Sequence, residues 1–157
     1  MTVAPEEVIC RWYYDDVVLD VMPTDEKILG FGNKWYKDAI ENASGYTFSS
    51  GSNIKTVTAA YFLATKMEAF KTRGKSDCYA SRDFEDIVSV LDGRSGIVEE
   101  IQNSKENVKD YLVQSLRDIY HSLSFKGAVP GHFVQYGNLA DGRIELLEQK
   151  LKMIIQG

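Results

Sequence analysis

The hydrophobic pattern of the chain favours strands in its first third and helices after it. Residues rich in aromatic and β-branched side chains predict short strands at 8–14, 17–22, 46–48 and 54–57. Asp15-Asp16 separates the first two strands and is expected to form a two-residue hairpin turn. A flexible loop at 49–53 joins the second pair, and Asn33 is expected to cap a short helix at 34–42.

From Thr58 onward, apolar residues recur with a helical period. Helices are expected at 59–73 after Thr58, at 82–92 after Ser81, at 96–102, at 105–124 after Ser104, and at 139–155. The stretch 125–137 contains glycines and a proline and is expected to be a loop. The sequence therefore predicts an α+β fold, with a short antiparallel β portion in residues 1–57 followed by a helical bundle in residues 58–157.

Two of the expected helices carry charged residues inside their apolar stripes. At about 100° per residue, Lys66 and Arg73 lie on the apolar side of the first helix, and Tyr61 lies on its polar side. In the next helix, Asp83 lies inside the stripe and Asp86 on its border. Isolated buried charges are unfavourable, so these groups are expected to pair or to meet a charged ligand. Two interpretations stay open: an ion-pair cluster that fixes the angle between the helices, and a polyanion site in which the carboxylates orient the cations.

A single aspartate interrupts the apolar strand at 17–22. Strand alternation puts Asp20 on the same face as Val18 and Met22, where β-propensity does not favour a carboxylate. With Asp15-Asp16 as the turn, Arg11 is expected directly opposite Asp20. The aspartate then either forms a cross-strand ion pair or projects into a cleft as a metal ligand or base.

The composition is that of an ordinary globular domain. The 157 residues suit one domain with a real core, and 44% hydrophobic residues are typical of soluble proteins. A net charge of −5 argues against a broad nucleic-acid-binding surface. Because no apolar run is long enough to span a membrane and no signal-peptide pattern opens the chain, the expected location is cytoplasmic. Cys10 and Cys78 lack metal-site spacing and are expected to be free thiols.

The order of these charged residues resembles that of a known family. A strand with a single aspartate, a helix with the pattern K-x-x-A-x-x-x-R and a helix beginning R-D-x-x-D follow one another in the abortive-infection toxin (AbiEii-like) type of the nucleotidyltransferase superfamily. The corresponding segments here are Leu19-Asp-Val-Met-Pro23, Lys66-Met-Glu-Ala-Phe-Lys-Thr-Arg73 and Arg82-Asp-Phe-Glu-Asp86. The resemblance covers residues 8–125.

The resemblance implies a metal-dependent transfer of a nucleotidyl group from a nucleoside triphosphate to an acceptor, with Mg²⁺ as the cofactor. Asp20 would match a catalytic carboxylate that holds the metal, and Lys66 would match a catalytic lysine that contacts the nucleotide phosphates. Asp83 would match a catalytic or orienting acid. Arg73 and Asp86 are expected to join Lys66 in nucleotide binding.

The sequence departs from the family at one essential point. The Gly-Ser…Asp-x-Asp motif, which supplies two further carboxylates, does not occur in it. The chain is therefore expected to be the truncated, C-terminal part of a nucleotidyltransferase-like protein, with an incomplete sheet, weak or absent Mg²⁺ binding and no activity alone. A preceding segment or a partner protein would supply the rest. One alternative is a non-catalytic nucleotide- or protein-binding module related to toxin–antitoxin systems, and another is a purely structural role for the charged cluster.

Overall fold

A computed structural model describes residues 10–30 and 32–157 of the chain, which divides into two compact units, Met1–Asn33 and Lys34–Gly157. Residues 8 and 9 of the first predicted strand lie outside the described residues. The predicted domains, 1–57 and 58–157, stay a prediction.

The first unit contains a β-hairpin and one turn of helix. Strands β1 (Arg11–Tyr14) and β2 (Val17–Asp20) pair antiparallel, in the register predicted from the turn. Asp15 in the turn has φ 49°, a left-handed conformation that aspartate adopts more readily than most residues. Helix α1 (Glu26–Leu29) begins at the side-chain cap Asp25 and ends at Gly30, whose φ is 73°. This short helix was not predicted from the sequence.

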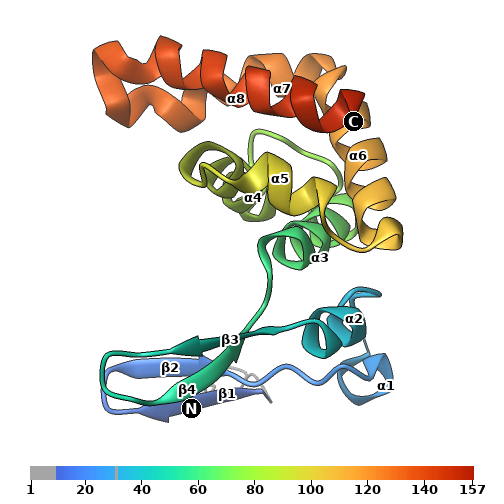
Figure 1. Cartoon of the computed structure of the whole chain (residues 1–157), viewed down its shortest axis with the longest axis vertical. Coiled ribbons are helices and arrows are strands. Elements are labelled where there is room, and N and C mark those ends of the chain that lie inside the picture. Colours follow the sequence, from blue (N-terminus) through green and yellow to red (C-terminus); the bar gives the residue numbers. More distant parts are fainter. Residues whose placement is uncertain (1–9, 31) are drawn as a thin grey trace, which may run out of the picture. The chain divides into compact units, whose positions relative to one another are not determined.

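The second unit contains one further hairpin and the helices of the bundle (Figure 1). Its elements are α2 (Tyr36–Glu41), β3 (Ser44–Thr47), β4 (Asn53–Thr56), α3 (Ala59–Thr72), α4 (Arg82–Gly93), α5 (Ile97–Gln102), α6 (Glu106–Tyr120), α7 (Leu123–Ala128), the 3₁₀ segment η1 (Val129–Leu139) and α8 (Ala140–Gln156). Strands β3 and β4 form a two-stranded antiparallel sheet of their own. The predicted α+β fold, with a short β portion and a helical bundle, is confirmed.

Helix α3 is the central packing element of the second unit, because it contacts α2, α4, α5 and α6. Helix α8 packs against η1, α4, α5 and α6. The core consists of side chains from these helices, and its largest fully buried members are Phe70, Phe84, Phe133, Leu63, Met67, Ile87, Leu91, Ile97, Ile101, Leu112, Leu116 and Leu147. Burial of this apolar area is the main force that holds α3 and α4 at fixed positions. Within the described residues, no helix is long and apolar enough to cross a membrane.

Three local predictions were wrong. The stretch 125–137 is helical, because it buries Phe125 and Phe133 in the core despite its glycines. Lys105 rather than Ser104 is the N-cap of α6, and the Ser104 hydroxyl donates instead to the carbonyl of Ile101 at 2.6 Å. Helix α2 begins after Trp35, so Asn33 is not its cap.

The polar side predicted for α3 was also partly wrong. Tyr61 was expected to face solvent, but it is buried, with its ring 6.2 Å from that of Trp35. The helix is covered by α2 on the side that the projection had left to solvent. A helical projection identifies the apolar face of a helix. It does not show whether another element, here α2, also covers aromatic residues on the remaining faces.

Candidate functional site

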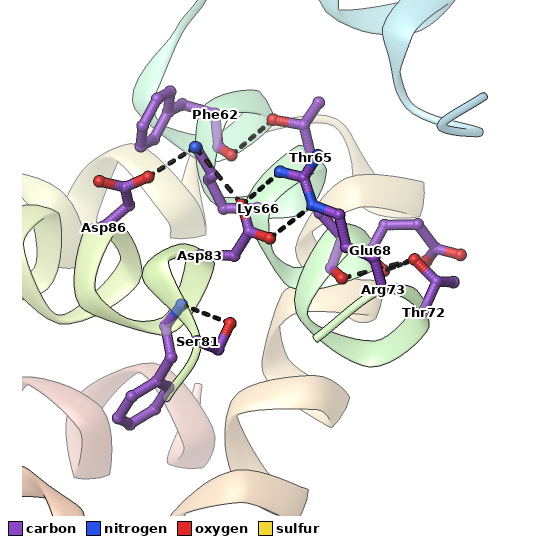
Figure 2. A network of polar contacts seen from close by, with 11 residues as sticks. Phe62, Thr65, Lys66, Glu68, Thr72, Arg73, Ser81, Asp83 and Asp86 are labelled. Atoms are coloured by element: carbon purple, nitrogen blue, oxygen red, sulfur yellow. Dashed lines mark hydrogen bonds and ion pairs between the residues drawn. The ribbon is translucent and has the colours of Figure 1, made fainter. Parts of the chain in front are cut away.

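The four charged residues predicted on α3 and α4 form one contiguous cluster (Figure 2). Arg73 makes two hydrogen bonds to Asp83, from Nε to Oδ2 at 2.8 Å and from Nη2 to Oδ1 at 2.7 Å. Lys66 Nζ lies 3.5 Å from Asp83 Oδ1 and 2.5 Å from Asp86 Oδ2. Asp83 therefore accepts from both cations, and Lys66 bridges the two carboxylates.

The cluster is buried at its centre and open at its edge. Only 7% of the Asp83 side chain is exposed, whereas 67% of the Arg73 side chain is. The hydrogen bonds from Arg73 hold the pKa of Asp83 below its ordinary value, and the same contacts raise the pKa of Arg73. An aspartate whose ionised form is favoured thus anchors two cations, of which Arg73 is exposed and Lys66 is partly buried.

The local sequence explains why the helices meet in this way. Arg73 is the C-cap residue of α3, and Asp83 lies in the first turn of α4. The side chain of Ser81 accepts a hydrogen bond from the Phe84 amide, which fixes the start of α4 as predicted. The loop at 73–81 returns the chain to α3, so that the end of one helix meets the beginning of the next.

Asp20 lies in the other unit, on strand β2. Its partner is Arg11, whose Nε and Nη2 donate to Oδ1 at 2.8 Å and to Oδ2 at 3.0 Å. The predicted cross-strand ion pair is therefore present, and the hydrogen bond from Arg11 lowers the pKa of Asp20. The register also places Trp12 opposite Leu19 and leaves every residue of both strands exposed.

The residues around Asp20 do not by themselves fit Mg²⁺. This ion favours several oxygen ligands in octahedral geometry, whereas both oxygens of Asp20 already accept hydrogen bonds from Arg11. Within residues 10–30 and 32–157, no group of three histidine, cysteine, aspartate or glutamate side chains lies close enough to hold a metal ion.

A second polar cluster, not predicted from the sequence, lies on the opposite side of α3. Glu68 Oε2 lies 3.0 Å from Lys34 Nζ and accepts from the Tyr111 hydroxyl at 2.7 Å. Lys71 donates to Ser115 Oγ at 2.6 Å, and both lysines lie over the Tyr111 ring. Burial lowers the pKa of Lys71 and raises that of Tyr111. No spacing could have revealed this cluster, because Glu68 and Tyr111 are 43 residues apart.

Phe62 is a further residue that sequence analysis left without a role. It lies one helical turn before Lys66, and the Lys66 ammonium is 5.6 Å from the centroid of its ring. Its signal was present in the sequence as an aromatic residue four positions before an inward-facing lysine, a spacing that places two side chains on one face.

No protein-family model, no curated protein and no solved structure matches the chain. The resemblance to nucleotidyltransferases therefore stays a prediction that depends on the three segments quoted above.

Proposed function

We propose that this chain is the C-terminal part of a nucleotidyltransferase-like protein and that its α3–α4 cluster holds the phosphates of a nucleoside triphosphate. Lys66 and Arg73 are the phosphate-binding cations. Asp83 holds both of them in place, and Asp86 positions Lys66. Asp20, in the other unit, would supply one carboxylate for metal binding, and a further segment or a partner protein would supply the others.

The observation that carries the proposal is the anchoring of an exposed arginine, Arg73, and a partly buried lysine, Lys66, by one buried carboxylate, Asp83. Asp83 engages two of the five N–H donors of Arg73, so three donors can still meet phosphate oxygens. Asp86 is about half-exposed, so its carboxylate can leave Lys66 when an anion of higher charge arrives. Cations fixed in advance lose less side-chain entropy when a ligand binds.

The transfer reaction itself is assigned to the completed protein and not to this chain. Both oxygens of Asp20 already accept from Arg11, so the residues around Asp20 do not form the metal sites on which this transfer depends. What the described residues contribute is binding and orientation of the nucleotide. The residues that would activate the acceptor hydroxyl belong to the part that completes the site.

A second candidate function is that of a non-catalytic module that binds a partner protein. It is favoured by hairpin β1–β2, whose strands pair only with each other among the described residues and expose apolar side chains on both faces. Strands that are apolar on both faces usually come from sheets covered on both sides. The same feature suits the first proposal, in which this hairpin joins a larger sheet.

Titration of ATP into the full chain, followed by calorimetry, tests the proposal. We expect a dissociation constant on the order of millimolar at low salt, because Coulomb attraction acts without a bridging metal. Binding should weaken at high salt and be lost in Lys66→Ala. The matched control is Lys152→Ala, since Lys152 is also a helical lysine beside a carboxylate, Glu148, at 3.8 Å.

Two outcomes would overturn this proposal. Binding that is equally strong in Lys66→Ala and in the native chain would remove the cluster from the site. Transfer of labelled nucleotide to RNA or protein by the chain alone, abolished in Asp20→Asn, would show that the chain is a complete enzyme. The expected result of that transfer assay is no labelled product.

A further inference from the structure

A cavity of about 620 Å³ lies beside the charged cluster, between the N-terminal end of α3 and the C-terminal end of α4. Its volume falls in the range of small-molecule sites, which is about 300–1,000 Å³. Phe62, Val57 and Val90 contribute apolar walls, and Tyr46 of β3 contributes an aromatic one. The cavity is therefore large enough for a planar ring and has aromatic side chains against which such a ring can stack.

The cavity and the cation pair lie along one strip of the helix pair. Phe62 lines the cavity, and its ring centroid lies 5.6 Å from the Lys66 ammonium. Figure 2 shows the two side chains near each other on α3. On α4, Ser89 and Val90 line the cavity and follow Asp86 by three and four residues, so all three share one face of the helix. The end of α3 at Arg73 meets the start of α4 at Asp83, and the start of α3 faces the end of α4 across the cavity, so the two helices run antiparallel.

This arrangement orders the groups that a ligand would meet along α3. Phe62 comes first, Lys66 follows one turn later, and Arg73 follows Lys66 by about 10 Å of helix. Apolar and aromatic groups thus stand at one end of the strip and phosphate-binding cations at the other. A ligand with a planar ring at one end and anionic groups at the other matches this order.

Polar groups at the cavity wall suit the edge of a heteroaromatic ring. Arg94 and Glu100 both line the cavity and form an ion pair, from Nε to Oε1 at 2.6 Å. Thr58, the N-cap residue of α3, lines it too, and its hydroxyl makes no capping bond. A purine or pyrimidine ring presents both donors and acceptors at its edge, and these side chains offer both kinds of partner.

We propose that this cavity is the base-binding subsite of the nucleotide whose phosphates meet Lys66 and Arg73. The inference rests on the function proposed above and adds the part of the ligand that the cation pair cannot recognise. The base stacks on Phe62, the sugar lies beside Ser89, and the phosphates continue toward Arg73.

Comparison of the four ribonucleoside triphosphates with inorganic tripolyphosphate tests the subsite, because tripolyphosphate has the charges but no base. By calorimetry on the full chain, we expect at least one of the four to bind about tenfold more tightly than tripolyphosphate, which corresponds to about 1.4 kcal/mol. Phe62→Ala removes the stacking wall, and Ser89→Trp fills the cavity from an exposed position of α4. Either variant should lower the affinity for that nucleotide to the level of tripolyphosphate, which should itself bind as before.

Tyr79→Ala is the matched control, since Tyr79 is an exposed aromatic residue outside the cavity lining. It should change neither affinity, and thermal unfolding followed by circular dichroism establishes that each variant is folded. If Phe62→Ala fails to fold, Ser89→Trp decides alone. Equal, Lys66-dependent binding of all four nucleotides and tripolyphosphate would overturn the base subsite and leave the phosphate site intact. If the chain binds neither the nucleotides nor tripolyphosphate, both the proposed function and the subsite are overturned.

Discussion

At the scale of single residues, Asp83 is the charge that most needs its partners. Arg73 donates two short hydrogen bonds to Asp83. The Lys66 ammonium lies 3.5 Å from Asp83 Oδ1 and also pairs with Asp86. We therefore expect Arg73→Met to lower the free energy of unfolding by about 2 kcal/mol and Lys66→Met by less than about 1 kcal/mol. Urea unfolding of both variants measures the difference. A larger loss in Lys66→Met would mean that Lys66 is the main partner of Asp83.

The lowered pKa of Asp83 gives the cluster a defined pH dependence. Below its ordinary pKa of 3.8, the unfolded chain binds a proton that the folded chain still excludes. The stability contributed by ionised Asp83 is thus complete above about pH 5 and is lost as the pH falls through the folded-state pKa. We expect the difference in unfolding free energy between the native chain and Asp83→Asn to shrink between about pH 5 and pH 2. Urea unfolding at a series of pH values measures it, and a difference that stays constant would contradict the ionised state.

At the scale of elements, the C-terminal end of α4 depends on a side chain from α8. Lys150 Nζ donates to the carbonyls of Leu91 at 2.8 Å, Asp92 at 2.8 Å and Arg94 at 3.1 Å. A helix leaves its last carbonyls without backbone partners, and a cation there also interacts favourably with the negative end of the helix dipole. We expect Lys150→Met to cost about 1–2 kcal/mol in thermal or urea unfolding, against less than about 0.5 kcal/mol for the exposed Lys152→Met. Similar losses in the two variants would refute the capping role.

The elements predicted from the sequence are those with strong local signals. The β1–β2 register followed from the position of the turn, and α4 followed from the cap Ser81 together with an apolar stripe that Asp83 interrupts. The helical stretch at 125–137 was predicted as a loop because Gly127 and Pro130 are helix breakers in isolation, and only packing in the core overrides them. The ion-pair cluster was predictable because its members break the apolar pattern. The polar cluster around Tyr111 and the cavity beside Phe62 were not predictable, since their residues come from distant segments that meet only in the folded chain.

At the scale of the whole molecule, the hairpin β1–β2 exposes a run of large aromatic and apolar side chains. Trp12, Tyr13 and Tyr14 on β1 are 65%, 73% and 79% exposed, and Val18 on β2 is 54% exposed. Natural proteins usually protect such strands with charge, proline or a covering element, because open edges and apolar side chains promote association. Apart from the single ion pair of Arg11 and Asp20, the paired residues of this hairpin are uncharged.

We therefore expect the isolated chain to self-associate with rising concentration when no partner covers this hairpin. Sedimentation velocity over a concentration series should show species larger than the 17.7 kDa chain. Trp12→Lys with Val18→Lys, one on each face, should shift the distribution to monomer, because burying the two new charges in an interface is unfavourable. Leu123→Lys is the control, since Leu123 is an exposed apolar residue on α7, outside the hairpin. A native chain that stays monomeric, or a control that dissociates it equally, would show that the hairpin is not the associating surface.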